Sequence, residues 1–140
     1  MINKPEYLIH RVVMEMDRKA DELLMQHFNM SYKRGHYLAV LQDGGTMTQH
    51  KLAVILGHSD PAVSKMLLEL SKEGLVSIKI DPKHARKRLV TITKKGDELT
   101  TKGNKILNEH FSRVMINAKV DPAKFAALTK KILDSLLIRI

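Results

Sequence analysis

The chain has 140 residues, which suits a single domain with a substantial core, and its 44% hydrophobic and 28% charged content is ordinary for a globular protein. No run approaches the ~18 apolar residues of a membrane span, and the N-terminus lacks the apolar block of a signal peptide. The absence of cysteine excludes disulfides, thiolate catalysis, cysteine-ligated zinc and cysteine-based redox sensing within the chain. We therefore expect a cytoplasmic protein without a membrane partner.

Two helices are predicted in the N-terminal part of the chain. Residues 3–28 carry apolar side chains at three- or four-residue steps, and Asn3 can cap the N-terminus of this long helix. Ser31 can cap a second helix over residues 32–42, and Asp43-Gly44-Gly45 predicts its end. The first helix therefore has one long apolar stripe that needs a large surface to pack against.

Two shorter helices follow. Thr48 can cap the first of them, and Gly57 can end it in a left-handed conformation. The second begins at Ser59-Asp60-Pro61, because a polar cap followed by proline favours a helix start, and Gly74 ends it. The two helices are thus separated by a tight turn.

A hairpin is predicted next. Residues 76–80 and 89–93 read as strands, joined by a polar turn around Asp81-Pro82. Residues 79–95 hold seven lysines and arginines against one aspartate, which is +6 of the formal net charge of +9. A run of charge is often a solvated face. Concentration of two-thirds of the net charge beside a helix-turn-helix favours contact with nucleic acid instead.

The C-terminal part of the chain predicts two more helices. Thr93 can cap a long helix from 94 to about 119, in which Gly96 and Gly103 predict a bend or fraying near the start. Asp121-Pro122 starts the last helix, which stays apolar to the end of the sequence. The apolar faces of the first and last helices together make a large surface that a partner subunit can cover.

Several short motifs follow one another in a recognisable order. They are Leu52-Ala53, Leu56-Gly57, the segment from Val63 to Leu70, Gly74-Leu75-Val76, Asp81-Pro82, Arg86, Leu89-Val90 and Thr93-Lys94-Lys95-Gly96. No single motif is specific, but the ordered set resembles the multiple antibiotic resistance regulators (MarR family) of bacterial transcription factors. The resemblance covers nearly the whole chain.

The resemblance implies a mainly α fold with a small β-hairpin wing. It implies one domain over residues 1–140, in which 31–93 form the winged helix-turn-helix DNA-binding lobe and 1–28 and 94–140 are dimerisation helices. The apolar residues predicted at the dimer interface are Leu8, Ile9, Val12, Phe111, Val114, Phe125, Leu128, Ile132, Leu136, Leu137 and Ile140.

Three groups of residues are candidates for contact with double-stranded DNA. Those at or near the N-terminus of the second motif helix are His58, Ser59, Asp60, Pro61, Ala62, Ser64 and Lys65. Those of the wing are Lys83, His84, Arg86, Lys87 and Arg88. Those that open the first motif helix are Thr48, Gln49 and His50.

Recognition is expected to use the second motif helix in the major groove, with its first turns toward the base edges. Ser64 and Lys65 can donate to guanine or to phosphate. Asp60 either caps the helix or accepts a hydrogen bond from a cytosine amine, and capping is the expected role. In the resembled family an aspartate two positions before the wing arginine supports the wing. Arg86 matches the arginine, but His84 stands at the place of the aspartate.

The function that the resemblance implies is that of a homodimeric repressor. It would bind an inverted repeat with half-sites roughly 10 base pairs apart, and a small aromatic or amphipathic effector would release it. Two alternatives stay open: a zinc-responsive regulator of the same fold, and a winged-helix module that binds protein. The seven histidines show no close ligand pair on one helical face, so no metal site or cofactor is predicted. No catalytic motif indicates an enzyme.

Overall fold

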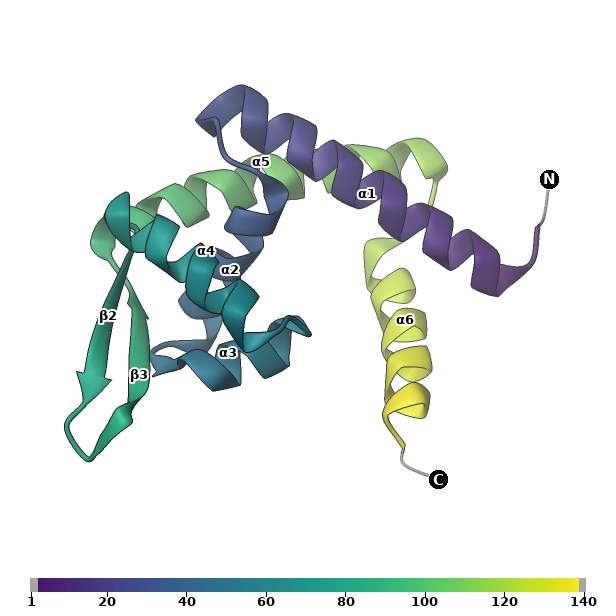
Figure 1. Cartoon of the computed structure of the whole chain (residues 1–140). Helices are drawn as coiled ribbons and strands as arrows, with labels where there is room; N and C mark the ends of the chain where they lie inside the picture. The colour runs from purple at the N-terminus through teal and green to yellow at the C-terminus, as the bar shows by residue number, and fades with distance from the viewer. Residues whose placement is uncertain (1–2, 139–140) are drawn as a thin grey trace. The chain divides into compact units, whose positions relative to one another are not determined.

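The computed structural model describes residues 3–138 and divides the chain into two compact units, Met1–Asn104 and Lys105–Ile140. The elements run in the order α1 (Pro5–Phe28), α2 (Tyr32–Gly44), β1 (Met47–Thr48), α3 (Gln49–Leu56), α4 (Asp60–Lys72), β2 (Val76–Asp81), β3 (His84–Ile92), α5 (Lys94–Ala118) and α6 (Pro122–Leu137) (Figure 1). The predicted mainly α fold with a small hairpin wing is confirmed.

Most of the predicted helix caps are present. A side-chain oxygen accepts a hydrogen bond from a backbone N–H of the first turn at Ser31, Thr48, Ser59, Thr93 and Asp121. The prediction for Asn3 was wrong: α1 begins at Pro5, its N-cap is Lys4, and no side chain caps it. Proline suits the first position of a helix, because it has no N–H to leave unpaired, and this moves the cap to the preceding residue.

The end of α2 also differs from the prediction. The helix continues to Gly44, two residues beyond the predicted end, and Gly45 carries the positive φ of 73° that stops it. Glycine adopts this conformation without the steric cost that other residues meet there. The glycine pair is therefore a helix end, but its second member provides the stop.

The sheet has three antiparallel strands in the order β1-β3-β2. β3 begins at His84, whereas the sequence predicted a strand from residue 89, and the turn is confined to Pro82-Lys83. Pairing continues outward from Val90 to Ile80↔Arg88 and then Asp81↔His84, with an irregularity between Ile80 and Asp81. Arg86, Lys87 and Arg88 therefore stand on a strand rather than in a loop, while Lys83 lies in the turn.

The core of the first unit joins α2, α3, α4 and the sheet. Its fully buried large side chains are Tyr37, Leu38, Leu41, Leu52, Val63, Leu67, Leu70 and Val90. The prediction that Val63, Leu67 and Leu70 of α4 belong to the core is thus confirmed. This packing holds the outer face of α4 on a rigid base.

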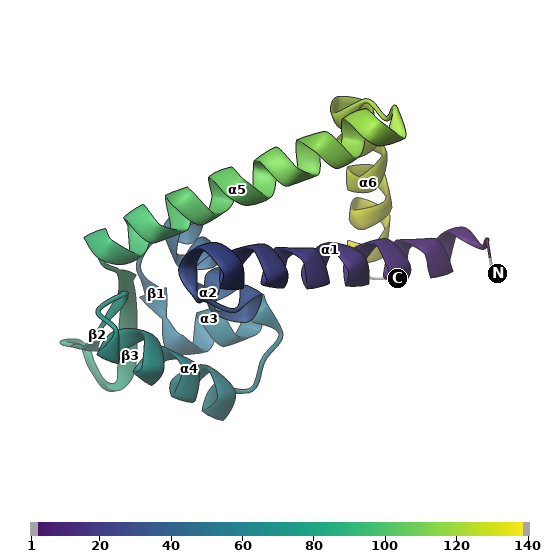
Figure 2. The ribbon, with the colours of Figure 1, turned by 90° about the horizontal axis from the view of Figure 1, so that it is seen from above.

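The start of α5 is attached closely to the turn that follows α4. Thr93 Oγ1 donates to the carbonyl oxygen of Gly74 at 2.6 Å, and Lys95 Nζ donates to that of Glu73 at 2.8 Å. Gly96 has no room for a side chain, since a Cβ there would overlap the carbonyl oxygen of Leu75. The expected fraying is absent, because α5 runs without a break from Lys94 to Ala118 (Figure 2).

A second attachment of α5 uses the Gln42 amide of α2. Its Nε2 donates to Asp97 Oδ1 at 2.9 Å and to Thr101 Oγ1 at 3.0 Å, while Asn104 Nδ2 donates to Gln42 Oε1 at 3.3 Å. The first turns of α5 therefore belong to the winged lobe by direct side-chain contact, and not merely by chain connectivity.

The second unit contains the rest of α5 and α6. Asp121 Oδ1 accepts from the backbone N–H groups of Ala123 and Lys124, which fixes the start of α6. No residue of α6 is buried, although its sequence is strongly apolar on one face. Across residues 3–138, no helix has the length and apolar content needed to cross a membrane.

Candidate nucleic-acid interface

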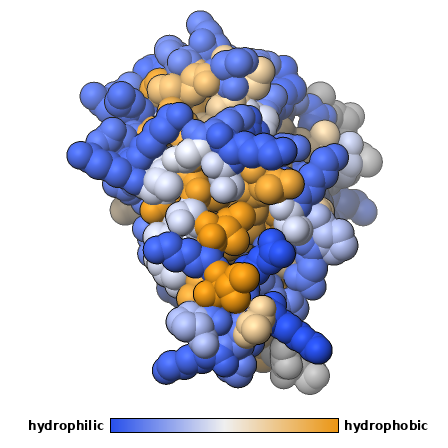
Figure 3. Space-filling view, turned by 60° about the vertical axis from the view of Figure 1, so that its left-hand side comes forward, coloured by the Kyte–Doolittle hydropathy of each residue, from blue (hydrophilic) through white to orange (hydrophobic). Residues whose placement is uncertain are grey.

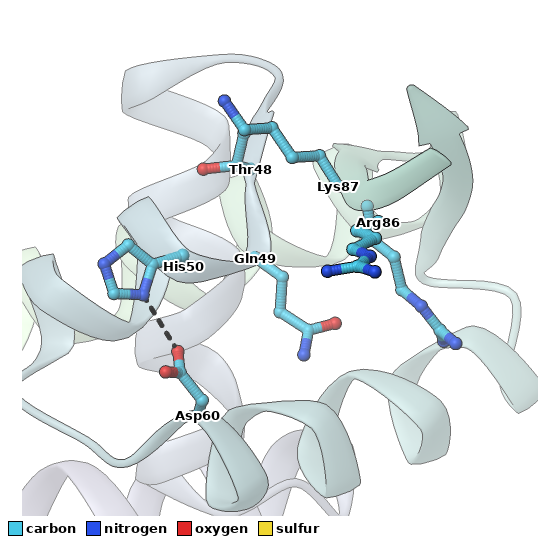
Figure 4. A pocket seen from close by; sticks show the side chains of 7 residues that line it. Thr48, Gln49, His50, Asp60, Arg86 and Lys87 are labelled. Atoms are coloured by element: carbon cyan, nitrogen blue, oxygen red, sulfur yellow. Dashed lines mark hydrogen bonds and ion pairs between the residues drawn. The ribbon is translucent and has the colours of Figure 1, made fainter. Parts of the chain in front are cut away.

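The N-termini of α3 and α4 meet β3 around a surface hollow of about 340 Å³ (Figure 4). The side chains that line it are Thr48, Gln49, His50, Asp60, Arg86, Lys87 and Arg88. All three candidates of the first motif helix are present, together with three of the wing and one of the second helix. Segments that lie up to 40 positions apart in sequence are thus brought to one place.

Side-chain caps determine where α3 and α4 begin, and both helix starts lie at this hollow. Thr48 Oγ1 accepts from the Lys51 N–H at 3.1 Å, and Ser59 Oγ accepts from the Ala62 N–H at 3.3 Å. Asp60 is the first residue of α4 and does not cap it, so the expected capping role was wrong. Ser59 already supplies the cap, which leaves the Asp60 carboxylate free for another contact.

That contact is with the first motif helix. His50 Nδ1 lies 3.2 Å from Asp60 Oδ1, and the dashed line in Figure 4 marks this pair. Both side chains are mostly exposed, with 76% and 59% of their side-chain surface accessible. A polar contact this exposed adds little to stability, because water competes for both groups. It joins the start of α3 to the start of α4 beside the hollow.

The charge in the hollow is strongly positive. Arg86, Lys87 and Arg88 supply three permanent cations from consecutive positions of β3, and Asp60 opposes them with one carboxylate. Gln49 and Arg86 point into the hollow (Figure 4). Guanidinium and ammonium groups bind phosphate oxygens through charge-assisted hydrogen bonds. The arrangement therefore suits a polyanion better than a neutral ligand.

The wing turn has a support that the sequence did not reveal. Asp81 Oδ1 accepts from the backbone N–H of Lys83 at 2.9 Å, which closes the turn between β2 and β3. His84, at the position where the resembled family has an aspartate, is exposed and pairs with Asp81 in the sheet. An aspartate that bonds the N–H two residues onward is a common turn device, and Asp81-Pro82 was the available signal.

The other candidates of the second helix do not line the hollow. Pro61, Ala62 and Lys65 are exposed on the outer side of α4, and Ser64 is half-buried. His58 is not exposed as predicted: it is half-buried in the turn before α4, where its Nδ1 lies 2.9 Å from the Tyr37 hydroxyl. His58 therefore attaches this turn to the core. Lys83 stands exposed at the wing tip.

Figure 3 shows the wing side of the molecule as a largely hydrophilic surface with a narrow group of hydrophobic side chains at its centre. Large apolar side chains that stay exposed on α4 and β2 include Leu68 and Ile80, at 54% and 64%. Within residues 3–138, no three histidine, aspartate or glutamate side chains come close enough together to hold a metal ion.

The residues predicted at a dimer interface are mostly exposed. In α1, Leu8, Ile9 and Val12 are 42–50% accessible. In the second unit, the exposed members are Val114, Phe125, Leu128, Ile132, Leu136 and Leu137, at 41–76%. Phe111 is half-buried, and Ile140 lies outside the described residues.

Helix, tight turn, helix and a basic two-stranded wing define a winged helix-turn-helix protein. Residues 28–87, which span this motif up to the middle of the wing, match the family model described as "MarR family". The winged helix-turn-helix of this chain is therefore of the MarR family, and the resemblance seen in the sequence is confirmed.

Solved structures agree in fold over almost the full length. MepR, a transcription regulator of the Staphylococcus aureus multidrug efflux pump MepA, is 26% identical, with a TM-score of 0.74 over 95% of this chain and 98% of that one. MepR in a DNA complex gives a TM-score of 0.79 at 24% identity, over 96% and 98%. Apo MarR from E. coli gives 0.81 at 21% identity, over 99% of both chains. None of the curated proteins matches this sequence significantly.

Proposed function

We propose that the protein is a sequence-specific transcriptional regulator that binds double-stranded DNA as a homodimer. The observation that carries the proposal is the cationic hollow between α3, α4 and β3, in which the helix starts and three wing cations face the same space. Clustering of this kind is what a phosphate backbone requires, because neutralised phosphates release counterions and so drive binding.

The proposal assigns different roles to the two kinds of residue. Contacts with the phosphate backbone of the DNA come from the start of α3, with Thr48, Gln49 and His50, and from the wing. The wing contacts are Lys83, His84, Arg86, Lys87 and Arg88. Base edges are read by the exposed face of α4, through Pro61, Ala62, Ser64 and Lys65, while Ser59 and His58 hold the start of that helix. Phosphate contacts position a protein on DNA, and contacts to base edges specify the sequence.

Two solved relatives support the choice of partner. One is the S. aureus MepR–DNA complex, and the other is a mutant MarR from E. coli complexed with operator DNA. The similarity to the MarR complex covers 95% of this chain and 93% of that one at 20% identity, with a TM-score of 0.79. A shared fold with DNA-bound proteins and a cationic hollow at the helix starts together favour DNA over a protein partner.

Dimerisation is the second part of the proposal. Residues 31–93 serve as the DNA-binding lobe, and the helices of 1–28 and 94–140 pair with those of a second copy. The apolar faces of α1 and α6 support this, because many large side chains there are about half exposed or more. An exposed apolar face along a helix is uncommon on a protein that acts alone, and each of the two units has one.

The proposed mode of action is repression in the cytoplasm, with release from DNA by a small aromatic or amphipathic effector. A two-fold dimer would place two α4 helices about 34 Å apart, so the target is an inverted repeat with half-sites roughly 10 base pairs apart. The likeness to MepR, a transcription regulator of a multidrug efflux pump, supports a regulatory role.

The test is selection of bound duplexes from a random DNA pool by the purified protein at two salt concentrations. Recovery of an inverted repeat, with affinity that falls steeply as salt rises, is the expected result. Equal recovery of all sequences would contradict sequence-specific regulation, and failure to bind duplex DNA at low salt would contradict DNA binding altogether.

A further inference from the structure

Among the described residues that line the cationic hollow, Asp60 is the single carboxylate. We infer that Asp60 reads a cytosine amine in the major groove and that His50 is the positioning residue that aims it. The inference rests on the proposed DNA binding and adds one base-reading residue and its orienting partner.

The Asp60 carboxylate has no role in holding α4 together that would explain its place. Ser59 caps the helix through the Ala62 N–H, so the carboxylate is not needed for capping. A negative charge in the first helical turn does gain a little from the helix dipole. That gain is available to a side chain in any direction, whereas this one is directed at His50 over the hollow (Figure 4).

The chemistry of the duplex limits what a carboxylate here can bind. Phosphates repel it, so it can gain only from hydrogen-bond donors on base edges. The major groove offers two amines, cytosine N4 and adenine N6. In adenine, the N7 acceptor lies beside the N6 amine, and this acceptor repels a carboxylate that approaches the amine. Cytosine is therefore the base that an acceptor-only side chain at the start of a recognition helix selects.

His50 gives the carboxylate a fixed direction. It comes from α3, ten positions before Asp60, and its Nδ1 lies 3.2 Å from one carboxylate oxygen, Oδ1. The second oxygen, Oδ2, stays available for an incoming donor. Because the pair joins the starts of two helices, the aim of Asp60 depends on the spacing between α3 and α4. Other charges on the hollow, Arg86, Lys87 and Arg88, come from β3 and are all positive.

The experiment compares base preferences of variants by the same random-pool selection. Wild type is expected to show a symmetric pair of positions at which cytosine is preferred. Asp60→Ala should reduce that preference by roughly tenfold, the lower part of the range for a good base contact. Asp60→Asn should shift it toward adenine, since an amide pairs with both N6 and N7 of that base. Preferences at the other positions should stay as in wild type.

The His50 variants test positioning separately. An asparagine amide nitrogen can stand close to where the histidine Nδ1 stands, so His50→Asn should keep the cytosine preference. His50→Ala should weaken it while leaving the thermal melting curve unchanged. Asp43→Asn removes an equal charge from an exposed residue outside the hollow and should alter no base preference.

The outcomes distinguish the roles of Asp60 and His50 from DNA binding itself. An inverted repeat that Asp60→Ala and Asp60→Asn select with the wild-type preferences would overturn the role of Asp60 and leave the DNA-binding proposal standing. Equal loss of preference in His50→Asn and His50→Ala would overturn the positioning role of His50. A wild-type protein that binds no duplex would overturn both the inference and the proposed function.

Discussion

Tyr37 and His58 illustrate how single side chains hold the start of the second motif helix. Tyr37 is fully buried in α2, and its hydroxyl lies 2.9 Å from His58 Nδ1, in the turn before α4. A buried hydroxyl without a partner is costly, so the pair both satisfies Tyr37 and ties the turn to the core. The orientation of the residues after His58 therefore depends on the buried hydroxyl of Tyr37.

Tyr37→Phe tests this tie. Loss of the hydroxyl should lower the free energy of unfolding by about 1 kcal/mol, the typical worth of one intramolecular hydrogen bond. Urea denaturation followed by circular dichroism measures it. The ring is kept, so a loss several times larger would mean that the hydroxyl does more than bond His58. An unchanged midpoint would mean that the bond contributes nothing.

The same residue predicts a dependence of stability on alkaline pH. Burial raises the pKa of the Tyr37 phenol above its ordinary value of 10.0, and burial, followed by the charge of Asp17, raises the pKa of Tyr32. The folded state thus favours the protonated phenol, while the unfolded chain ionises near pH 10. The stability from this difference is complete below that pH and is lost as pH rises through the folded-state pKa. Urea midpoints from pH 9 upward should fall, and less steeply in Tyr37→Phe.

The start of α5 depends on a close approach to the backbone of the turn that follows α4. Gly96 lies against the carbonyl oxygen of Leu75, while Gly103 in the same helix would place a Cβ 3.3 Å from the Leu24 side chain. A side chain can move aside, whereas a backbone carbonyl held in a turn cannot. The two glycines therefore have different reasons to be there, which their shared position in one helix does not reveal.

Gly96→Ala and Gly103→Ala form a matched pair for this difference. Alanine is intrinsically better in a helix by up to ~1 kcal/mol, so Gly103→Ala should be close to neutral or slightly stabilising. Gly96→Ala should lower the free energy of unfolding by about 1–3 kcal/mol, because the added methyl group displaces the turn after α4. Thermal or urea unfolding of the two proteins compares them directly. Equal effects would contradict the role of close approach at Gly96.

The cations of the wing strand β3 are predicted to determine how DNA affinity depends on salt. Arg86→Ala should weaken binding to many sequences alike and reduce the slope of log affinity against log salt by about one unit, since one phosphate contact is lost. Gel-shift titrations at several salt concentrations measure this slope. Lys102→Ala removes a charge from an exposed position of α5 outside the hollow and should leave the slope unchanged.

Over the whole molecule, the exposed apolar faces predict a dimer. Leu128 is 61% accessible in α6, and each such leucine that becomes buried contributes ~1.5–3 kcal/mol. Leu128→Glu should therefore weaken self-association strongly, with each change counted twice in a symmetric dimer. The fold of the winged lobe should be kept, because no α6 residue belongs to its buried core.

Analytical ultracentrifugation provides the measurement, with wild type sedimenting as a dimer at micromolar concentration. Val54→Glu places the same charge on an apolar residue of α3 that is 67% accessible, and it should leave the mass unchanged. A monomeric wild type would contradict the dimer proposal. A dimer that survives Leu128→Glu unweakened would place the interface elsewhere.

Features set by neighbours in sequence could be predicted well. The caps at Ser31, Thr48 and Ser59 each need one side-chain oxygen and an N–H three residues later, so the order of helices followed directly from the residues. The turn at Asp81-Pro82 and the concentration of cations beside it were also visible. The prediction for Asn3 was wrong because Pro5 is the first residue of α1, which moves the cap from Asn3 to Lys4.

Contacts between distant residues were decided by the tertiary structure. The extension of β3 back to His84 depends on pairing with β2, because the charged residues there have no strand pattern of their own. The pairs His50–Asp60 and Tyr37–His58 join residues 10 and 21 positions apart, and the hollow joins three elements. Sequence determined which helices form and that the wing is cationic, since hydrogen bonds within a turn and charge are local. Packing decided which of these side chains face one another.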